Sequence, residues 1–534
     1  MGAPTWTIGR YVVESLVANG IDTVFGIPGV HTLELYRGLA AAGIRHVLVR
    51  HEQNAGFAAD GYARVSGKPA AAFVISGPGV TNIMTAVAQA YSDSVPLLVV
   101  ATTPARASLG KRWGVLHELI DQCGLASHAT GIARTALSAD DVRDHLRAAF
   151  ASFESGRPRP AFLDVPLDLL AETTEHRPER FVHVSGRLQA SPEAIAQAIA
   201  WLATARRPLI IAGGGARGAA DALRRLAEAV DGFVVTTAAG KGVLPERHPA
   251  NLGASLPYRK TQDLIAAADL VLAVGTELSE GDTYTTRLTI TGRLIRVDVD
   301  AGKLSDHYGA QLALWGDART SLEAIAAGTT ARAGWRTEAG AAGTQRLQIE
   351  QRFGAATQAC MTALQAIRDS LPADSSVFTD MTQIAYLGNY AYPADRPGVW
   401  FHPSGYGTLG YALPAALGAK LARPERPIIA LAGDFGVQFT SQELMTAVEL
   451  QLNLPLVVWN NGALGQIRDD MHAAGIPPIG VVARNPDFVS LAHACGAHAV
   501  RTHGPAALTE AIGAALLRRG PTLLEAAEAD FLPQ

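Results

Sequence analysis

Two short apolar runs near the carboxyl end of the sequence each lead to polar residues that commonly bind metal ions. The run "PIIALA" is followed by Gly433 and Asp434, and the run "PLVVW" by Asn460 and Asn461. Runs that are apolar throughout are typical of strands buried on both faces of a parallel sheet. Ligands bind beyond the carboxyl ends of such strands. If the two strands are neighbours, a carboxylate and an amide oxygen therefore reach one crevice.

This oxygen set is suited to Mg²⁺. A carboxylate, an amide oxygen and a backbone carbonyl fall short of six ligands, and Mg²⁺ usually completes its octahedron with phosphates and water. The neighbouring glycines would let backbone N–H groups approach a diphosphate. Aspartate, asparagine and glycine also favour ordinary turns. A Gly-Asp pair alone would be interpreted as a turn, but its combination with the two asparagines after the second strand favours a metal site.

The spacing of these residues matches a known motif. Gly433-Asp434, then Phe435, then 24 residues from Gly436 to Trp459, precede the two asparagines. This pattern resembles the thiamine diphosphate-binding motif GDG-x(24–27)-NN, in a likeness that extends over nearly the whole chain. By it the chain is similar to the acetolactate synthase and 2-oxo acid decarboxylase superfamily. The third motif position is Phe435 rather than glycine, and we expect Gly436 to supply the lost flexibility.

The resemblance implies a set of metal and diphosphate contacts. Thiamine diphosphate and Mg²⁺ are the expected cofactors. The implied metal ligands are the side chains of Asp434 and Asn461 and the backbone carbonyl of Ala463. The diphosphate contacts would come from Gly433, Phe435 and Gly436.

A glutamate in the first third of the chain is the expected catalytic carboxyl. Glu52 lies in "RHEQNAGFAADGYAR", after the apolar run "HVLV" and before a helix of small residues, and it matches the family pattern "HEQxAGxAAxGYAR". The resemblance implies that this carboxyl, desolvated, pairs with the aminopyrimidine ring of the cofactor and favours loss of the thiazolium C2 proton. Alone, a glutamate that satisfies helix-start donors would be the simpler reading.

Two further stretches match the family's cofactor contacts. "SGYGTLGYALPAALGA" places Leu409 where a bulky side chain is pressed between the two cofactor rings, and "SGPGVTN" matches the loop that lines the site from the first domain. The remaining cofactor-binding candidates are Ser76, Gly77, Pro78, Gly79, Asn82, Gln383, Gly407 and Leu409.

The choice among members of the superfamily depends on two stretches. In "RWGVLHELIDQ", His117 could relay protons as a decarboxylase requires, with Glu118 beside it and Gln122 slightly beyond the usual glutamine of acetolactate synthases. An ordinary loop histidine is an equal alternative. In "GQIRDDM", Gln466, Asp469 and Asp470 could bind a cationic substrate tail, although a solvated helix face explains them as well.

Together, "LHEL" and "GQIRDDM" resemble 5-guanidino-2-oxopentanoate (2-ketoarginine) decarboxylases. The expected function is non-oxidative decarboxylation of a 2-oxo acid, with 2-ketoarginine favoured, through a carbanion/enamine intermediate. One alternative is an acetolactate synthase-type carboligase. The other is a nucleotide-binding scaffold without catalysis, which would have no reason to keep Glu52 together with the metal pair.

The whole chain alternates buried strands with Ala/Leu-rich helices, which predicts α/β architecture with three doubly wound parallel-sheet domains. Stretches 172–191 and 328–343 lose apolar periodicity and are predicted linkers. The predicted domains are pyrimidine-binding (1–171), central (190–327) and diphosphate-binding (355–534). A shared "MTAV" start of two helix–strand units predicts that the outer domains have one topology. Because Glu52 and Asp434 lie in opposite outer domains, the resemblance implies a homodimer or homotetramer with sites at the interface.

Composition excludes several other classes. The net charge of −4 and pI near 6.4 give no basic surface for nucleic acid or membrane, and no run approaches the ~20 apolar residues of a spanning helix. Three cysteines show no zinc or disulfide spacing, so we expect a cytoplasmic protein. FAD is expected to be absent or dispensable, because "GASLPYRKTQ" and "GTELSEGDTY" stand where acetolactate synthases carry "GMHGT" and "GARFDDR".

Overall fold

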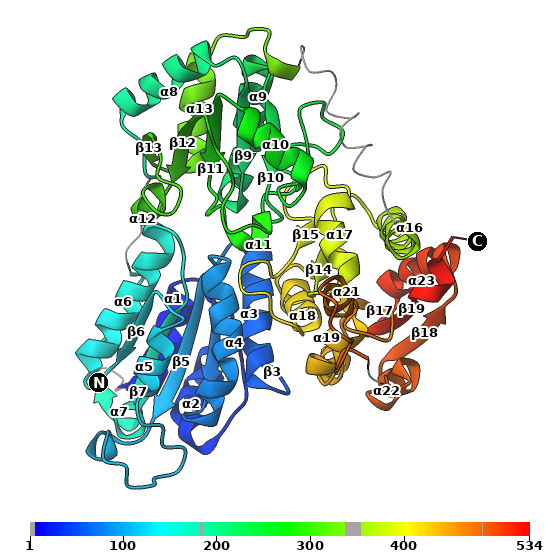
Figure 1. Ribbon diagram of the computed structural model, residues 1–534. Helices are drawn as coiled ribbons and strands as arrows, with labels where there is room; N and C mark the ends of the chain where they lie inside the picture. The colour runs from blue at the N-terminus through cyan, green and yellow to red at the C-terminus, as the bar shows by residue number, and fades with distance from the viewer. Residues whose placement is uncertain (1–5, 182–185, 337–353, 483, 534) are drawn as a thin grey trace.

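The computed structural model describes residues 6–181, 186–336, 354–482 and 484–533, which form three α/β domains (Figure 1). In the view of Figure 1 the first and last domains lie side by side and the central domain sits above both. Each domain is built on its own parallel sheet, as the alternation of apolar strands and helices predicts. The expected α/β class with three parallel-sheet domains is confirmed.

The first domain has a six-stranded parallel sheet in the order β3-β2-β4-β5-β7-β6. A short antiparallel pair, β1 (Trp6–Thr7) with β8 (Thr173–Thr174), ties its two ends together. The strands are β2 (Thr23–Gly26), β3 (Arg45–Leu48), β4 (Ala70–Val74), β5 (Leu97–Thr103), β6 (Ile132–Thr135) and β7 (Ala161–Pro166). The helices are α1 (Ile8–Ala18), α2 (Leu33–Ala42), α3 (Glu52–Ser66), α4 (Pro78–Ser92), α5 (Gln122–Ser127), α6 (Ala139–Ser155) and α7 (Leu167–Ala171).

The central domain has a five-stranded parallel sheet in the order β10-β9-β11-β12-β13. Helices cover the sheet, and some of them begin with a side-chain cap; at the start of α8, Ser191 accepts a hydrogen bond from the N–H of Ala194 at 3.2 Å. The strands are β9 (Pro208–Ala212), β10 (Phe233–Thr236), β11 (Leu270–Val274), β12 (Arg293–Asp298) and β13 (Leu312–Trp315). The helices are α8 (Pro192–Thr204), α9 (Ala220–Val230), α10 (Arg259–Ala267), α11 (Glu280–Thr283), α12 (Ala301–Leu304) and α13 (Ala318–Gly328).

The last domain has a six-stranded parallel sheet in the order β15-β14-β16-β17-β19-β18. The strands are β14 (Ser376–Thr379), β15 (Trp400–Phe401), β16 (Ile428–Gly433), β17 (Pro455–Asn460), β18 (His498–Thr502) and β19 (Thr522–Ala527). The helices are α16 (Ala355–Ser370), α17 (Gln383–Ala391), α18 (Ala412–Ala422), α19 (Asp434–Thr440), α20 (Glu443–Glu449), α21 (Gly465–Ala473), α22 (Phe488–Ala494) and α23 (Pro505–Leu517), followed by the 3₁₀ turn η4 (Glu528–Phe531).

The two outer domains share one topology. The parallel strands of each sheet can be numbered in chain order, starting from β2 in the first domain and from β14 in the last. With this numbering both sheets have the strand order 2-1-3-4-6-5. Thus β4 corresponds to β16, β5 to β17, and the edge strand β3 to β15. The repeated "MTAV" stretch lies in equivalent helical segments, α4 and α20.

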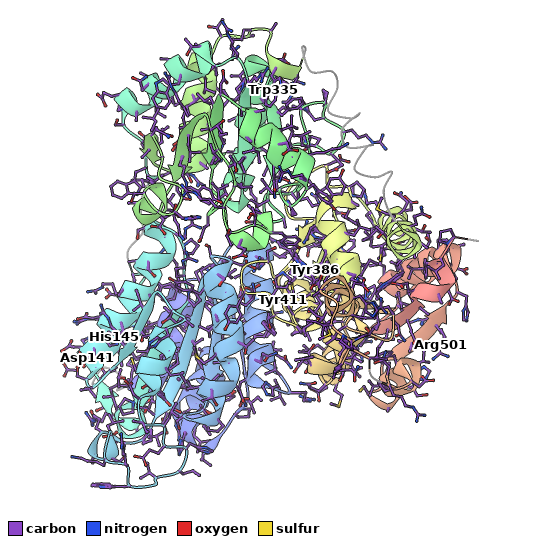
Figure 2. All side chains as sticks on the ribbon, viewed as in Figure 1. Asp141, His145, Trp335, Tyr386, Tyr411 and Arg501 are labelled. Carbon is purple, nitrogen blue, oxygen red and sulfur yellow. The ribbon has the colours of Figure 1, made fainter. Side chains whose placement is uncertain are left out.

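Helices α3 and α18 join the outer domains at close range. A Cβ on Gly61 would lie 1.9 Å from the carbonyl oxygen of Ala415, and one on Gly418 would lie 1.8 Å from that of Ala58. Glycine at both positions therefore allows backbone-to-backbone packing between the helices. The Tyr411 hydroxyl, labelled in Figure 2, donates to the buried carboxylate of Asp60 across the same interface.

Parts of both predicted linkers, residues 182–185 and 337–343, lie outside the described residues. Within the described chain, no helix combines the length and the apolar composition that crossing a membrane would require.

Candidate active site

Strands β16 and β17 are parallel neighbours, with Gly433 opposite Trp459. Their carboxyl ends therefore lie at the same edge of the sheet. Asp434 begins helix α19 directly after β16, and Asn461 follows the last residue of β17. The tertiary structure thus brings together the two segments that the spaced motif singles out.

Asp434 is a buried carboxylate, 2% exposed. Its Oδ2 accepts a hydrogen bond from Nδ2 of Asn485 at 2.6 Å, and among the described residues no lysine, arginine or histidine forms an ion pair with it. Burial raises the pKa of Asp434 above its ordinary value, against the hydrogen bonds that favour the ionised form. A buried carboxylate without a cationic partner fits a bound metal ion, which would supply the missing charge.

Asn461 and Ala463 are the other two predicted metal ligands. Oδ1 of Asn461 accepts from the N–H of Ala463 at 3.2 Å, and its Nδ2 donates to Oε1 of Gln383 at 3.2 Å. Gly462 between them has a φ of +66°, a conformation that favours glycine. Within the described residues no group of three His, Cys, Asp or Glu side chains could hold a metal. One carboxylate with an amide and a carbonyl oxygen is a partial set of ligands, which phosphate and water oxygens would have to complete around Mg²⁺.

The structure corrects the expected role of Gly436. This residue lies inside helix α19 without a positive φ, so it supplies no unusual flexibility. Instead, a Cβ at Gly436 would lie 2.6 Å from Oδ2 of Asp380, and glycine is needed for space. Phe435 lies in the first turn of the same helix, also without a positive φ, so nothing in the local backbone requires glycine at the third motif position.

The loop that carries Leu409 is held from both sides. Gly407 and Gly410 have φ values of +73° and +84°. The N–H of Gly410 donates to both carboxyl oxygens of Asp380, at 3.0 and 2.9 Å, and Thr440 Oγ1 donates to the Gly410 carbonyl at 3.0 Å. With the hydrogen bond from the N–H of Gly407 to the Pro403 carbonyl at 3.1 Å, these contacts fix the backbone on either side of the half-buried Leu409.

Glu52 is the first residue of helix α3, directly after the N-cap residue His51. Its Oε2 accepts from Nδ2 of Asn82 at 2.9 Å, which ties two predicted site residues together. Glu52 is half-buried, so the expected desolvation is only partial in the single chain. Within the described chain no hydrogen bond or ion pair connects Glu52 with Asp434 or Asn461.

The loop of residues 75–77 leads into helix α4, and the buried side chain of Gln122 holds it in place. Oε1 of Gln122 accepts from the N–H of Gly77 at 3.2 Å, while Nε2 donates to Asp164 Oδ1 at 2.6 Å and to the Thr102 carbonyl at 2.7 Å. Gly77 has a φ of +65°, and a Cβ there would lie 2.6 Å from the carbonyl oxygen of His117. Gln122 is therefore placed to position this loop rather than to face a substrate.

His117 is paired with a second histidine that sequence reasoning missed. The rings of His31 and His117 meet edge to face, with centroids 5.1 Å apart, and His31 Nδ1 lies 2.5 Å from Ser76 Oγ. Burial, followed by the nearby His117, lowers the pKa of His31. His31 follows strand β2 after a short turn, so the rule that ligand groups follow strand ends could have indicated it. A second missed residue is Asn485, which orients Asp434 from the loop before α22.

The substrate candidates come from two domains: Glu118 from the first domain, and the other three from helix α21 of the last domain. Glu118 accepts from the N–H of Gly114 at 2.7 Å and so closes its own loop. On α21, Asp470 accepts from Gln466 Nε2 at 3.0 Å, whereas Asp469 accepts from Gln383 Nε2 at 2.9 Å. Only Asp469 therefore connects directly with the residues around Asn461.

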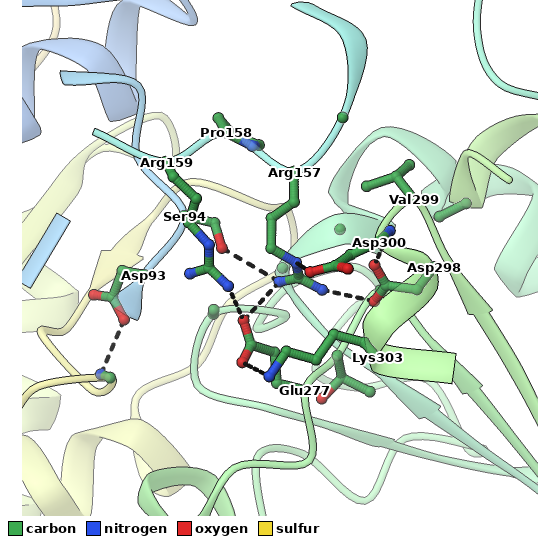
Figure 3. Close-up of a pocket in the computed structure, with 18 of the residues that line it drawn as sticks. Asp93, Ser94, Arg157, Pro158, Arg159, Glu277, Asp298, Val299, Asp300 and Lys303 are labelled. Carbon is green, nitrogen blue, oxygen red and sulfur yellow. Dashed lines mark hydrogen bonds and ion pairs between the residues drawn. The ribbon is translucent and has the colours of Figure 1, made fainter. Parts of the chain in front are cut away.

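The glycine turn after β9 and the segment after β11 border a cavity of about 930 Å³ between the domains (Figure 3). The N–H groups of Gly213 and Gly215 donate to the carbonyls of Val274 and Gly275 at 2.9 and 3.1 Å, so they are not free to bind a phosphate.

Several charged side chains that line this cavity form ion pairs with one another around Glu277. Glu277 pairs with Arg157 and Arg159 at 2.9 Å each and with Lys303 at 2.8 Å, while Arg157 also pairs with Asp298 at 2.7 Å. Burial opposes ionisation of Glu277, but these cations hold its pKa below its ordinary value. A diphosphate bound beside Glu277 would have to compete with these ion pairs.

Comparison with known proteins gives three matching family models. The description "Thiamine pyrophosphate enzyme, N-terminal TPP binding domain" matches residues 6–125, the central domain of the same enzymes matches 195–325, and the C-terminal TPP binding domain matches 380–526.

Individual relatives cover nearly the whole chain. A protein of Pseudomonas aeruginosa named "Probable 2-ketoarginine decarboxylase AruI" is 50% identical over 98% of this chain and 94% of its own length. The acetolactate synthase isozyme 1 large subunit of Escherichia coli is 31% identical over 86% of this chain and 83% of its own. The acetolactate synthase of Mycobacterium bovis is 31% identical over 93% and 83%.

Proposed function

The chain belongs to the thiamine pyrophosphate enzymes, and on that premise we propose that it is a thiamine diphosphate- and Mg²⁺-dependent decarboxylase of 2-ketoarginine. The observation that carries the proposal is the pairing of β16 with β17, because Asp434, a buried carboxylate without a cationic partner among the described residues, and Asn461 each follow one of these strand ends. The Pseudomonas relative supports decarboxylation and the substrate, because it is much more similar to this chain than the acetolactate synthases are.

Each part of the cofactor has candidate residues. Asp434, Asn461 and the carbonyl of Ala463 would hold Mg²⁺, and Gly433, Phe435, Gly436 and Gln383 would lie around the diphosphate. Leu409 and Gly407 would contact the ring end, and Glu52, oriented by Asn82, would hold a proton shared with the pyrimidine. Bound thiamine diphosphate supplies the electron sink for the electron pair released when the bond between C2 and the carboxylate carbon of the substrate breaks.

His117 and His31 are proposed to move protons at the substrate. Their edge-to-face contact and the bond from His31 to Ser76 place both rings beside the loop that is expected to line the site. Gln122 would position that loop through Gly77. Replacement of His31 by glutamine should lower kcat about tenfold and move the acid limb of the pH–rate profile. An unchanged profile would exclude His31 from proton transfer.

The active enzyme is proposed to be a homodimer or a pair of homodimers. Glu52 and Asp434 lie in different domains and have no direct contact within the described chain. Around the histidine pair, apolar side chains are 58–67% exposed, which is typical of a subunit interface; they are Val30, Leu33, Trp113, Leu116 and Ile120. Analytical ultracentrifugation of the protein and of a Trp113→Glu variant tests this surface, since the variant should dissociate and lose activity.

FAD is proposed to be dispensable. The bonded glycine turn and the neutralised ion-pair cluster around Glu277 support this. Protein purified without added flavin should show no flavin absorbance and should keep its full activity; a rise in activity upon addition of FAD would contradict the proposal.

A product assay separates decarboxylation from the alternative, acetolactate synthase-type carboligation. The holoenzyme is incubated with 2-ketoarginine or with pyruvate, and CO₂, aldehyde and acetolactate are measured. We expect CO₂ and 4-guanidinobutanal from 2-ketoarginine. Acetolactate from pyruvate as the main product would favour the carboligase instead. A scaffold without catalysis is not supported, because Glu52, Asn82 and the metal pair are all retained.

A further inference from the structure

A second cavity, of about 400 Å³, lies where the central domain meets the last domain. Its lining includes four tyrosines and three carboxylates, and among the described residues that line it there is no lysine, arginine or histidine. The lining comes from α10 and α11 regions of the central domain and from α16, α17, α21 and η4 of the last domain. The residues concerned, called here the tyrosine–carboxylate pocket, are Tyr258, Tyr284, Tyr386, Tyr390, Asp282, Asp469 and Glu528.

The tyrosines offer aromatic faces and hydroxyl groups to this space. The rings of Tyr258 and Tyr390 pack with centroids 4.8 Å apart, and Figure 2 shows Tyr386 on the side of the last domain that faces the central domain. Burial raises the pKa of Tyr258 to about 12 and that of Tyr386 further, so these phenols stay neutral. Neutral aromatic faces attract a cation, most strongly where water is excluded.

The carboxylates give the pocket its negative charge. Asp282 accepts from Ser279 Oγ at 3.1 Å, and burial raises its pKa to about 6. Burial also raises the pKa of Glu528, with the charges of Asp469 and Asp434 adding to the effect and Arg468 opposing it. Arg468 pairs with the other oxygen of Asp469 at 3.1 Å. A cation in this space would therefore relieve both desolvation and repulsion among acids.

One side chain connects this pocket with the proposed metal site. Gln383 lines the pocket, accepts from Asn461 Nδ2 at 3.2 Å and donates to Asp469 Oδ2 at 2.9 Å. The pocket therefore lies beside the proposed cofactor site, and a substrate that reacts at the ring end of the cofactor could extend a cationic tail toward Asp469. A guanidinium suits this lining because its planar fork of five N–H donors matches carboxylates and stacks on aromatic rings.

We propose that the tyrosine–carboxylate pocket binds the cationic tail of the substrate and selects a guanidinium group over a neutral group of the same shape. This inference rests on the proposed function, because it takes 2-ketoarginine decarboxylation as the reaction. It assigns specificity to Asp469 and Glu528 and to the tyrosine rings, while Asp470, which pairs with Gln466, has no direct part.

The test compares Asp469→Asn with Asp369→Asn. Asp369 is a matched control because it is an exposed carboxylate of the same domain and lies outside the pocket. Like Asp469, it accepts a hydrogen bond from a glutamine side chain, here from Nε2 of Gln365 at 2.7 Å. Glu528→Gln is the second variant. Holoenzymes are assayed with 2-ketoarginine and with its neutral ureido analogue, and calorimetry measures binding of 4-guanidinobutyrate and 4-ureidobutyrate.

We expect the wild type to favour the guanidino compounds at least tenfold. Asp469→Asn and Glu528→Gln should raise the KM for 2-ketoarginine about tenfold with little change in kcat, and should leave the ureido substrate unaffected; Asp369→Asn should match the wild type. The inference would be overturned if the wild type bound guanidino and ureido compounds equally, or if both pocket variants kept the wild-type selectivity. Either result would leave the proposed decarboxylase activity unaffected. If the wild type decarboxylates neither compound, the proposed function fails, and the calorimetry still decides whether the pocket selects a guanidinium.

Discussion

The first and last domains have the same order of strands, yet equivalent strand ends carry different groups. After β16, Asp434 begins the next helix at once, whereas after β4 three residues, Ile75 to Gly77, separate the strand from helix α4. The first arrangement places a buried carboxylate beside the asparagines of β17. The second gives a loop held by Gln122. One topology therefore supplies two different half-sites, and the residues at the strand ends decide which.

The edge strands differ in the same way. In the first domain β3 leads to the half-buried Glu52, which contacts Asn82. In the last domain β15 leads to His402, which is 7% exposed and lies 2.8 Å from Thr379 Oγ1 through its Nδ1. The comparison indicates a chemical role for Glu52 and a structural role for His402. Four substitutions test how chemical and structural roles are divided between the two domains.

Replacing Glu52 by glutamine should have the largest effect. Glutamine can still accept the hydrogen bond from Asn82, so cofactor affinity should change little, but the carboxyl needed for proton transfer is lost. We expect kcat to fall by roughly 10²- to 10⁴-fold, measured as CO₂ release, with affinity followed by calorimetry. Activity within twofold of the wild type would show that the first half-site is not catalytic.

Replacing Asp434 by asparagine should act on binding instead. The affinity for thiamine diphosphate with Mg²⁺ should fall by roughly 10²- to 10³-fold, because loss of one partner of a buried charge pair costs about 3–5 kcal/mol. The apo protein should respond in the opposite direction. Since burial raises the pKa of Asp434 in the folded state, its ionisation weakens folding as pH rises, so the apo variant should resist urea better than the wild type at pH 8. A less stable apo variant would contradict this account of the site.

Replacing Gly61 by alanine should weaken the packing between the two outer domains. The new methyl group would clash with the Ala415 carbonyl. We expect the free energy of unfolding, measured by urea denaturation, to fall by about 1–3 kcal/mol. Gly513 in helix α23 is the control, because nothing lies within 4 Å of an added Cβ. Gly513→Ala should be neutral or should stabilise by up to about 1 kcal/mol. Equal effects of the two changes would refute close packing between α3 and α18.

Replacing His402 by asparagine should have the smallest effect on activity, and its informative result is a change in the pH dependence of stability. Burial and then Arg64 lower the pKa of His402 to about 3, so the unfolded chain takes up a proton near its ordinary pKa of 6.5 while the folded chain does not. Stability should thus fall as the pH drops below about 6.5, by at most about 1.4 kcal/mol per pH unit. The urea midpoints at pH 7 and pH 5 should differ less in the variant. The exposed His498 of β18 is the control, and its replacement by asparagine should leave the wild-type difference intact.

Much of the site was predictable because its groups follow strand ends. The buried strands β16 and β17, the pair Asp434 and Asn461, and Glu52 at the end of an apolar run all follow from local sequence. The same rule applies to His31, but the turn between β2 and this histidine obscured it. Asn485 and the pocket tyrosines have no such signal, since they lie in loops and helices whose neighbours are distant in sequence. The domain boundaries and the roles of the site residues stay predictions.

The sequence by itself determined the alternation of buried strands and helices, the family of the enzyme and the chemical types at the strand ends, because these depend on periodicity and on residues close in the chain. Only the tertiary structure decided which carboxylates lack a cation, that Gln122 holds a loop, that Asp469 and Asp470 turn to different partners, and that tyrosines from two domains enclose one cavity. The physical reason is that burial, charge balance and close packing depend on neighbours brought together by folding, and no local pattern in the chain encodes them.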